Sequence, residues 1–177
     1  MSFDRLFAEV VIRCLPVHEV GVHVLRSANM RLQNEELVKT KFTGPYLRTE
    51  EGLASYAEEV TGTSSTELQR DYAGRVVAIA LMLGGNTFRQ TFESLKDAGF
   101  EDEQAWNLCA RTYRGGGFTR DSVYLGGYRQ VKEYVQKGGD VKILYIGKVG
   151  LHHADNIEDM LEDGRLVYPE YLPDFFV

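Results

Sequence analysis

Glycine-rich breaks divide the chain of 177 residues into segments of helical length. The breaks lie at Gly62, at Gly84 to Asn86, at Gly99, at Gly115 to Gly117 and at Gly138 to Gly139. Glycine ends helices readily because it adopts a positive φ without steric cost. Between the breaks, apolar residues recur at helical intervals, as at Phe88, Phe92 and Leu95. The sequence therefore predicts a mainly α fold of about seven helices with at most minor strand.

The expected helices follow from these breaks and from residues that can cap a helix. We expect helices over residues 4–28 with a bend or restart at Pro16 and an end near Asn29, and over 50–60, 67–83, 88–95, 102–113, 121–137 and 155–161. Residues 30–48 are predicted to form a loop with a short extended piece at most. The apolar run 141–146 fits either a strand or a buried turn of helix, and residues 168–176 are predicted to be irregular.

The composition indicates a globular chain, because 44% of the residues are hydrophobic and 11% are aromatic. The two cysteines are too few for a disulfide framework, which suits a reducing compartment. No apolar run approaches the roughly 20 residues of a membrane span, and the N-terminus lacks the pattern of a secretory signal. We expect one domain over residues 1–177 in a soluble, cytoplasmic protein without a membrane partner.

The net charge of −6 comes from the last part of the chain, residues 151–177, whereas the remainder is neutral. Proteins that bind nucleic acid present a basic stripe, and this sequence has none that dominates. Nucleic acid is therefore not an expected partner. We interpret the acidic end as a solvated surface.

The segment His18-Glu19-Val20-Gly21-Val22-His23 combines two imidazoles with a carboxylate. Neutral imidazoles bind zinc, and a glutamate beside the first ligand can accept the proton of an attacking water. Two histidines five residues apart lie about 140° apart around an ideal α-helix, so they would not face one ion. A local bulge would restore convergence, and Gly21 is where the backbone could yield. Two unrelated histidines on a core helix are the alternative.

A second acidic site follows about thirty residues later, at Glu50-Glu51-Gly52-Leu53-Ala54. A carboxylate from this helix would complete three protein ligands and leave a fourth position for water. Acidic residues are also favoured in the first turn of a helix by its dipole, which is the simpler interpretation.

Together these blocks, with Cys109 to Gly115 and Phe118 to Gly127, resemble the microtubule-associated tyrosine carboxypeptidases and their bacterial relatives with a QEGLA motif. The resemblance implies a zinc metallopeptidase with a gluzincin-like core, which could be the C-terminal part of a larger α/β domain. It implies His18, His23 and Glu51 as the metal ligands and Glu19 as the general base. Glu50 stands where the bacterial motif often has glutamine, which favours Glu51 as the ligand.

The resemblance also implies a substrate and a location. The expected activity removes a C-terminal residue, tyrosine or another aromatic, from a protein tail such as that of tubulin, in the cytoplasm and on the cytoskeleton. Family members usually carry a sizeable region before the metal helix, whereas this chain starts 17 residues before His18. We therefore expect either a catalytic-core fragment or a protein of reduced activity.

A carboxypeptidase must recognise a free carboxylate, and the planar guanidinium of arginine suits that task. With the family resemblance, Arg111, Arg114 and Arg120 become candidates for this role, and Tyr124 becomes a candidate donor to the developing oxyanion. Arginines near a helix C-terminus are otherwise ordinary surface residues. The adjacent His152 and His153 are interpreted as surface residues.

Two other functions remain open at this level. One is a non-catalytic interaction or regulatory domain that retains the metallopeptidase scaffold, and the other is a zinc peptidase of different specificity. The intact His-Glu-x-x-x-His pattern favours catalysis, because a structural zinc site has no need of Glu19.

Overall fold

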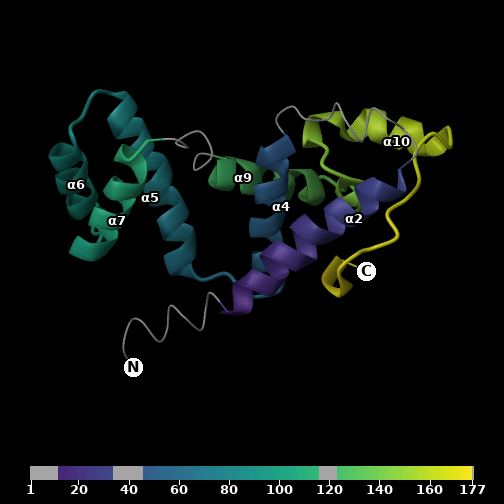
Figure 1. Ribbon diagram of the computed structural model, residues 1–177, viewed down its shortest axis with the longest axis horizontal. Coiled ribbons are helices and arrows are strands. Elements are labelled where there is room, and N and C mark those ends of the chain that lie inside the picture. The colour runs from purple at the N-terminus through teal and green to yellow at the C-terminus, as the bar shows by residue number, and fades with distance from the viewer. Residues whose placement is uncertain (1–11, 34–45, 116–122, 177) are drawn as a thin grey trace. The chain divides into compact units, whose positions relative to one another are not determined.

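The computed structural model describes residues 12–33, 46–115 and 123–176, and every element in these ranges is helical (Figure 1). This confirms the predicted mainly α fold. The chain forms two compact units, which are described separately. The first comprises Met1–Ser65 and Gly126–Val177, and the second comprises Thr66–Leu125.

The first described element of this unit is a helix that runs without interruption from residue 12 to residue 32. Its middle part is the π-helix η1 (Pro16–Val24), and its last part is α2 (Leu25–Leu32). The helix thus continues past Asn29, where we expected its end. Asn29 is buried and its amide hydrogen-bonds the backbone of Tyr171, so the side chain serves a tertiary contact instead of ending the helix.

The central helix of this unit is α4 (Tyr46–Val60), which starts four residues earlier than predicted. It is buried on most of its circumference from Thr49 to Glu58, as is typical of a helix enclosed by its neighbours. Leu53, Ala54 and Ala57 pack in one apolar core together with Val22 of η1.

The rest of the core of the first unit comes from the C-terminal third of the chain. The elements are α9 (Val123–Gln136), η2 (Val141–Tyr145), η3 (Leu151–His153), α10 (Ala154–Glu162) and η4 (Asp174–Phe176). The segment predicted as a strand or a buried turn of helix forms the 3₁₀-helix η2, in which Ile143, Leu144 and Tyr145 are buried, so the second alternative is correct. Asp140 caps this turn by accepting a hydrogen bond from the Lys142 N–H at 2.9 Å.

The segment that precedes η4 is irregular, as predicted, and is held against α2 by two amide side chains. Asn29 accepts a hydrogen bond from the N–H of Tyr171 and donates one to its carbonyl. Gln33, one helical turn later, makes the same pair of bonds to Val167. The two amides thus satisfy backbone groups that a neighbouring strand would otherwise satisfy.

Among the described residues, the second unit contains α5 (Thr66–Leu83), α6 (Phe88–Asp97), α7 (Asp102–Tyr113) and the first three residues of α9. Thr87 and Gln90 form a capping box at the start of α6, and Glu101 and Gln104 form one at the start of α7. The core of this unit contains the buried residues Ala78, Leu95, Phe100, Ala105, Leu108 and Cys109.

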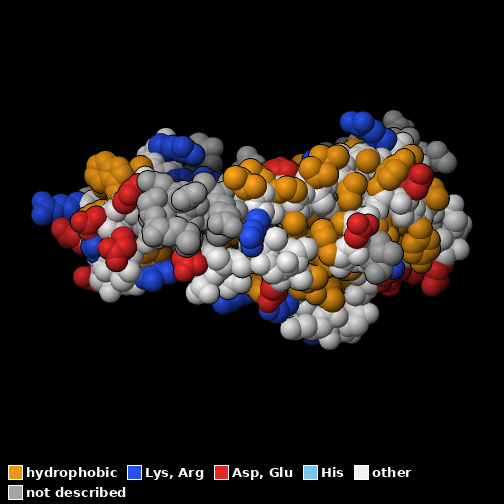
Figure 2. Space-filling model, turned by 90° about the horizontal axis from the view of Figure 1, so that it is seen from below, with side chains coloured by type: hydrophobic (Ala, Val, Ile, Leu, Met, Phe, Trp, Pro, Cys, Tyr) orange, Lys and Arg blue, Asp and Glu red, His pale blue; other side chains and the backbone are white. Residues whose placement is uncertain are grey.

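None of the helices in the described ranges is both long and apolar enough to cross a bilayer. On the face shown in Figure 2, basic side chains are scattered among acidic ones, and apolar side chains gather in several patches.

Candidate metal centre

The π-helix η1 brings His18 and His23 to the same side of the first helix. Their ring centroids lie 5.0 Å apart. A π-helix bonds each N–H to the carbonyl five residues back, and the Leu25 N–H makes such a bond to the carbonyl of Val20. Residues five apart therefore share a face, as the spacing of the histidines requires.

The local sequence explains why the backbone widens here. Pro16 stands at the start of the π segment, and proline cannot donate the hydrogen bond that a regular α-helix would need. Gly21 is buried, and a Cβ atom at this position would lie 3.1 Å from Cζ of Phe175. The carbonyl oxygen of Gly21 accepts a hydrogen bond from the Tyr145 hydroxyl at 3.0 Å. Of the two alternatives that the sequence left open, the structure therefore has the bulge, which extends over nine residues and is supported by the C-terminal third of the chain.

Glu51 of α4 completes a cluster with the two histidines. Its Oε2 atom lies 3.4 Å from Nε2 of His18 and 3.9 Å from Nε2 of His23. One ligand atom from each of the three residues falls within 4.8 Å of the others, a spacing compatible with one metal ion. The histidines retain some exposure, 13% and 20% of their side chains, whereas Glu51 is buried.

Two further carboxylates of α4 are buried beside this cluster. Glu58 Oε1 lies 2.8 Å from Nδ1 of His18, and Glu50 Oε1 lies 3.5 Å from Nδ1 of His23. Each histidine thus has its Nε2 atom toward Glu51 and its Nδ1 atom toward another carboxylate. Glutamate is rarely fully buried without a partner, so three such residues on one helix indicate a site of strong local charge.

The buried positive charge in contact with these carboxylates is that of Arg26. Its Nε and Nη2 atoms donate to the carbonyls of Leu144 and Val149, and its Nη1 atom lies 3.6 Å from Glu50 Oε1. Lys148, which is one-third exposed, lies 3.5 Å from the same oxygen. Burial alone would raise the pKa of Glu50, but the contact with His23 and the charges of Arg26 and Lys148 lower it.

The carboxylates of α4 also favour a positive charge on or beside the two imidazole rings. Burial alone would lower the pKa of His18, but its hydrogen bonds to Glu51 and Glu58 raise it to about 9. The cluster therefore stabilises a cation at this position, and a divalent metal ion would meet the same field.

Comparison with known proteins assigns the chain to a family. The family model described as "Microtubule-associated tyrosine carboxypeptidase" matches residues 2–177. The chain belongs to the microtubule-associated tyrosine carboxypeptidase family.

Curated relatives of the chain include microtubule-associated tyrosine carboxypeptidase 1 from Homo sapiens, which is 28% identical over 169 residues. The putative tyrosine carboxypeptidase MATCAP2 from Mus musculus is 26% identical over 171 residues. Each alignment covers 89% of this chain but only 35% and 32% of the respective relative. The chain therefore spans about a third of the length of these relatives.

The other residues predicted for a carboxypeptidase of this family are not members of the cluster formed by His18, His23 and Glu51. Glu19 follows His18 in η1 and is exposed. Arg111 is half-buried on α7, and Arg114 is the exposed C-cap residue of that helix. Both belong to the second unit, whereas the metal cluster belongs to the first. Arg120 lies outside the described residues.

Tyr124 also belongs to the second unit, at the start of α9. Its ring stacks on Tyr72 with centroids 5.2 Å apart, and the Arg75 guanidinium lies 5.6 Å from the centre of the Tyr124 ring. This packing fixes the ring of Tyr124 within its own unit.

The sequence interpretation for this family missed Glu58 and the buried position of Glu50. A signal for Glu58 was present, because residues seven apart on an α-helix lie on one face and Glu58 is seven residues after Glu51. No comparable pattern indicates that Arg26 lies buried beside Glu50.

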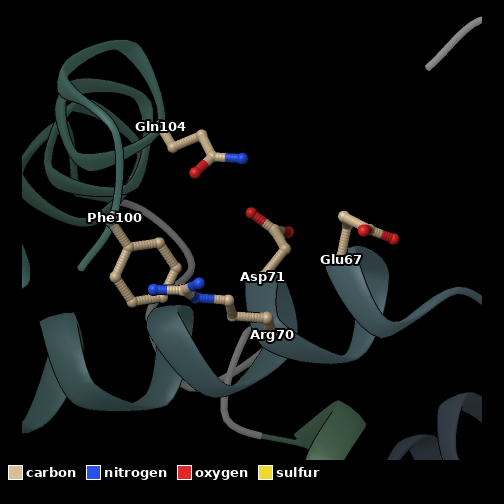
Figure 3. Close-up of a pocket in the computed structure, with 5 residues that line it drawn as sticks. All are labelled: Glu67, Arg70, Asp71, Phe100 and Gln104. Atoms are coloured by element: carbon tan, nitrogen blue, oxygen red, sulfur yellow. The ribbon is translucent and has the colours of Figure 1, made fainter. Parts of the chain in front are cut away.

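The second unit has a small hollow lined by Glu67, Arg70, Asp71, Phe100 and Gln104 (Figure 3). Arg70 stacks on the Phe100 ring, 4.6 Å from its centre, and donates to the carbonyl of Ala98. The hollow encloses about 70 Å³, well below the size of ordinary ligand sites.

Proposed function

We propose that the chain is a zinc-dependent carboxypeptidase that removes a C-terminal aromatic residue, tyrosine above all, from a protein tail. The observation that carries this proposal is that His18 Nε2 and His23 Nε2 of the π-helix η1 lie close to Glu51 Oε2 of α4, in a chain from a tyrosine carboxypeptidase family. Membership of the family supports the reaction class, and the cluster supports the metal.

The donor set fits zinc. Two imidazole nitrogens and one carboxylate oxygen are a ligand set of catalytic zinc sites, which keep one position open. The partial exposure of the two histidines leaves that position accessible, while the buried carboxylates of α4 favour a cation. Zinc bound here would supply Lewis-acid activation of water and of the scissile carbonyl.

Glu19 is the residue proposed to accept the proton of the attacking water. It directly follows a proposed ligand, and its exposure allows it to face an incoming substrate. The hydroxyl of Tyr124 is proposed to donate a hydrogen bond to the oxyanion that develops on the scissile carbonyl.

The proposed substrate is an acidic protein tail with a free carboxylate, such as the tail of tubulin, which would place the protein in the cytoplasm on microtubules. The name of the human relative supports an association with microtubules, and both names support a tyrosine as the residue removed. Arg111, Arg114 and Arg120 are proposed to bind the terminal carboxylate, because a guanidinium can make two parallel hydrogen bonds to it.

Metal analysis and peptide cleavage on the purified chain test this proposal together. We expect one zinc per chain, together with cleavage of peptides that end in tyrosine and no cleavage of the same peptides with an amidated C-terminus. Zinc without cleavage would instead support a non-catalytic domain that retains the scaffold. Equal cleavage of amidated peptides would support a zinc peptidase of other specificity, and absence of zinc binding would contradict the proposal.

A further inference from the structure

The two proposed ligand histidines differ in how their Nδ1 atoms are held. Glu58 Oε1 lies 2.8 Å from Nδ1 of His18, a full hydrogen bond. Glu50 Oε1 lies 3.5 Å from Nδ1 of His23 and at 3.5 to 3.6 Å from Lys148 and Arg26. Glu50 therefore shares its charge among three groups, whereas the short contact of Glu58 is with His18.

We propose that Glu58 is a positioning residue of the metal centre, which holds His18 in the tautomer that presents its Nε2 lone pair to the metal. The inference rests on the proposed function, because it deepens the description of the same site.

The hydrogen bond between Glu58 and His18 determines which nitrogen of the neutral imidazole carries the proton. An ionised carboxylate only accepts hydrogen bonds, and a neutral imidazole has one donor nitrogen and one acceptor nitrogen. Glu58 Oε1 lies 2.8 Å from Nδ1 of His18, so where this oxygen accepts the hydrogen bond, the proton of the neutral ring is on Nδ1. The lone pair is then on Nε2, the atom 3.4 Å from Glu51 Oε2.

The backbone of Glu58 is also fixed, so its carboxylate has a defined position. The side chain is 2% exposed, and the backbone carbonyl accepts hydrogen bonds from the N–H groups of Thr63 and Ser64, both at 2.9 Å. Glu58 and Glu51 are carried by the same helix two turns apart, which couples the position of the ligand to that of its partner. A carboxylate behind a ligand histidine raises the basicity of the ligand and orients the ring.

The first test compares Glu58→Gln with Glu59→Gln, a matched change at the next residue of α4. Glu59 is one-third exposed and pairs with Lys132 instead of a histidine. Zinc affinity is measured by competition with a chelator, and helicity by circular dichroism. We expect Glu58→Gln to weaken zinc binding 10- to 100-fold at unchanged helicity, and Glu59→Gln to leave it within about twofold. The absorption bands of bound cobalt(II) should shift only in the Glu58 variant.

The second test needs no variant. Nitrogen NMR of the zinc-loaded chain, labelled in histidine, reports which ring nitrogen carries the proton. We expect His18 to bind through Nε2 with a protonated Nδ1. Binding through Nδ1, or unchanged zinc affinity and cobalt spectrum in a folded Glu58→Gln variant, would overturn the positioning role while the zinc site stands. A wild-type chain that binds no zinc would overturn the proposed function as well.

Discussion

Gly52 of α4 and Gly127 of α9 pack backbone against backbone. A Cβ atom on Gly52 would lie 2.2 Å from the carbonyl carbon of Gly127, and one on Gly127 would lie 1.9 Å from the carbonyl oxygen of Arg48. Carbon atoms in contact are normally about 3.5 to 4.0 Å apart, so the two helices approach this closely only because both residues lack a side chain. Gly52 directly follows Glu51, and the contact therefore holds the backbone that carries the proposed ligand.

Gly52→Ala should therefore destabilise the first unit. The added methyl group meets backbone, which cannot turn away as a side chain can, and overpacking of this kind typically costs about 1–3 kcal/mol. Urea unfolding measures the change. Gly84→Ala is the comparison variant, because its Cβ would lie 3.3 Å from the carbonyl oxygens of Ala80 and Leu81, which need to give by only a few tenths of an ångström, and we expect a smaller loss than at Gly52. Equal stability of the two variants would contradict the close helix contact.

The amide of Asn29 offers a second test, which concerns the packing of the segment around Tyr171 against α2. Asn29→Ala removes the hydrogen bonds of 2.7 and 2.9 Å to the backbone of Tyr171 and leaves a small cavity. We expect a loss of about 1–3 kcal/mol in the free energy of unfolding. Asn107→Ala on the exposed side of α7 should be neutral or slightly stabilising, because alanine favours a helix. A neutral Asn29 variant would contradict a stabilising role for these bonds.

The ion pair between Glu59 of α4 and Lys132 of α9 should make the stability of the fold depend on pH. Glu59 accepts hydrogen bonds from Lys132 at 2.6 Å and from Tyr128 at 2.9 Å. Burial alone would raise the pKa of Glu59, but these bonds lower it below its ordinary value of 4.5. A depressed pKa stabilises the folded state above the unfolded pKa, and this contribution is lost as the pH falls through the folded pKa.

Wild type should therefore be more stable than Glu59→Gln at pH 7, and the difference should shrink as the pH falls below about 4.5. Thermal unfolding of both proteins across this range measures the difference. A stability gap that stays constant down to acidic pH would show that the charge of Glu59 does not cause it.

Much of the local structure could be predicted from the sequence, because local signals determine it. The glycine breaks and the apolar period locate α6 and α7 within a few residues. The spacing of five between His18 and His23 showed that the two histidines could face one ion only if the helix bulged, and Gly21 marked the place where it could do so. Each of these signals lies within one turn or two of the residues it determines.

The contacts that pattern reasoning missed join residues distant in sequence. Arg26 is buried because the carbonyls of Leu144 and Val149 accept its hydrogen bonds, and more than a hundred residues separate them from it. Asn29 reads as a helix end until its partner Tyr171 is known. The burial of Glu50 likewise depends on charges supplied by other elements, which no local pattern of α4 contains.

Glu19→Gln should separate catalysis from metal binding. The amide is similar in size but cannot accept the proton of water, so we expect peptide cleavage to fall by about 10²–10⁴-fold or more with zinc content unchanged. His18→Ala and Glu51→Ala should instead lose the metal. Zinc content and cleavage are measured on the same preparations. Near-full activity in Glu19→Gln would exclude it as the general base.

The arginines of α7 make the last prediction, which concerns specificity. An acidic tail must approach a chain whose own net charge is −6, so binding requires local positive charge. If Arg111 or Arg114 binds the terminal carboxylate, its replacement by alanine removes a charge-assisted contact. We expect kcat/KM to fall by an amount that corresponds to a loss of about 1.5–3 kcal/mol in transition-state stabilisation, with zinc content unchanged.

Peptides that end in Tyr, Phe and Lys, each with a free or amidated C-terminus, provide the measurement. The arginine variants should lose activity on the free carboxylates, and added salt should weaken cleavage of an acidic peptide more than of a neutral peptide of equal length. Arg89→Ala on the exposed side of α6 serves as the control, since Arg89 pairs only weakly, across one turn, with Glu93. If Arg111→Ala and Arg114→Ala both match this control on every peptide, the carboxylate is bound by other residues.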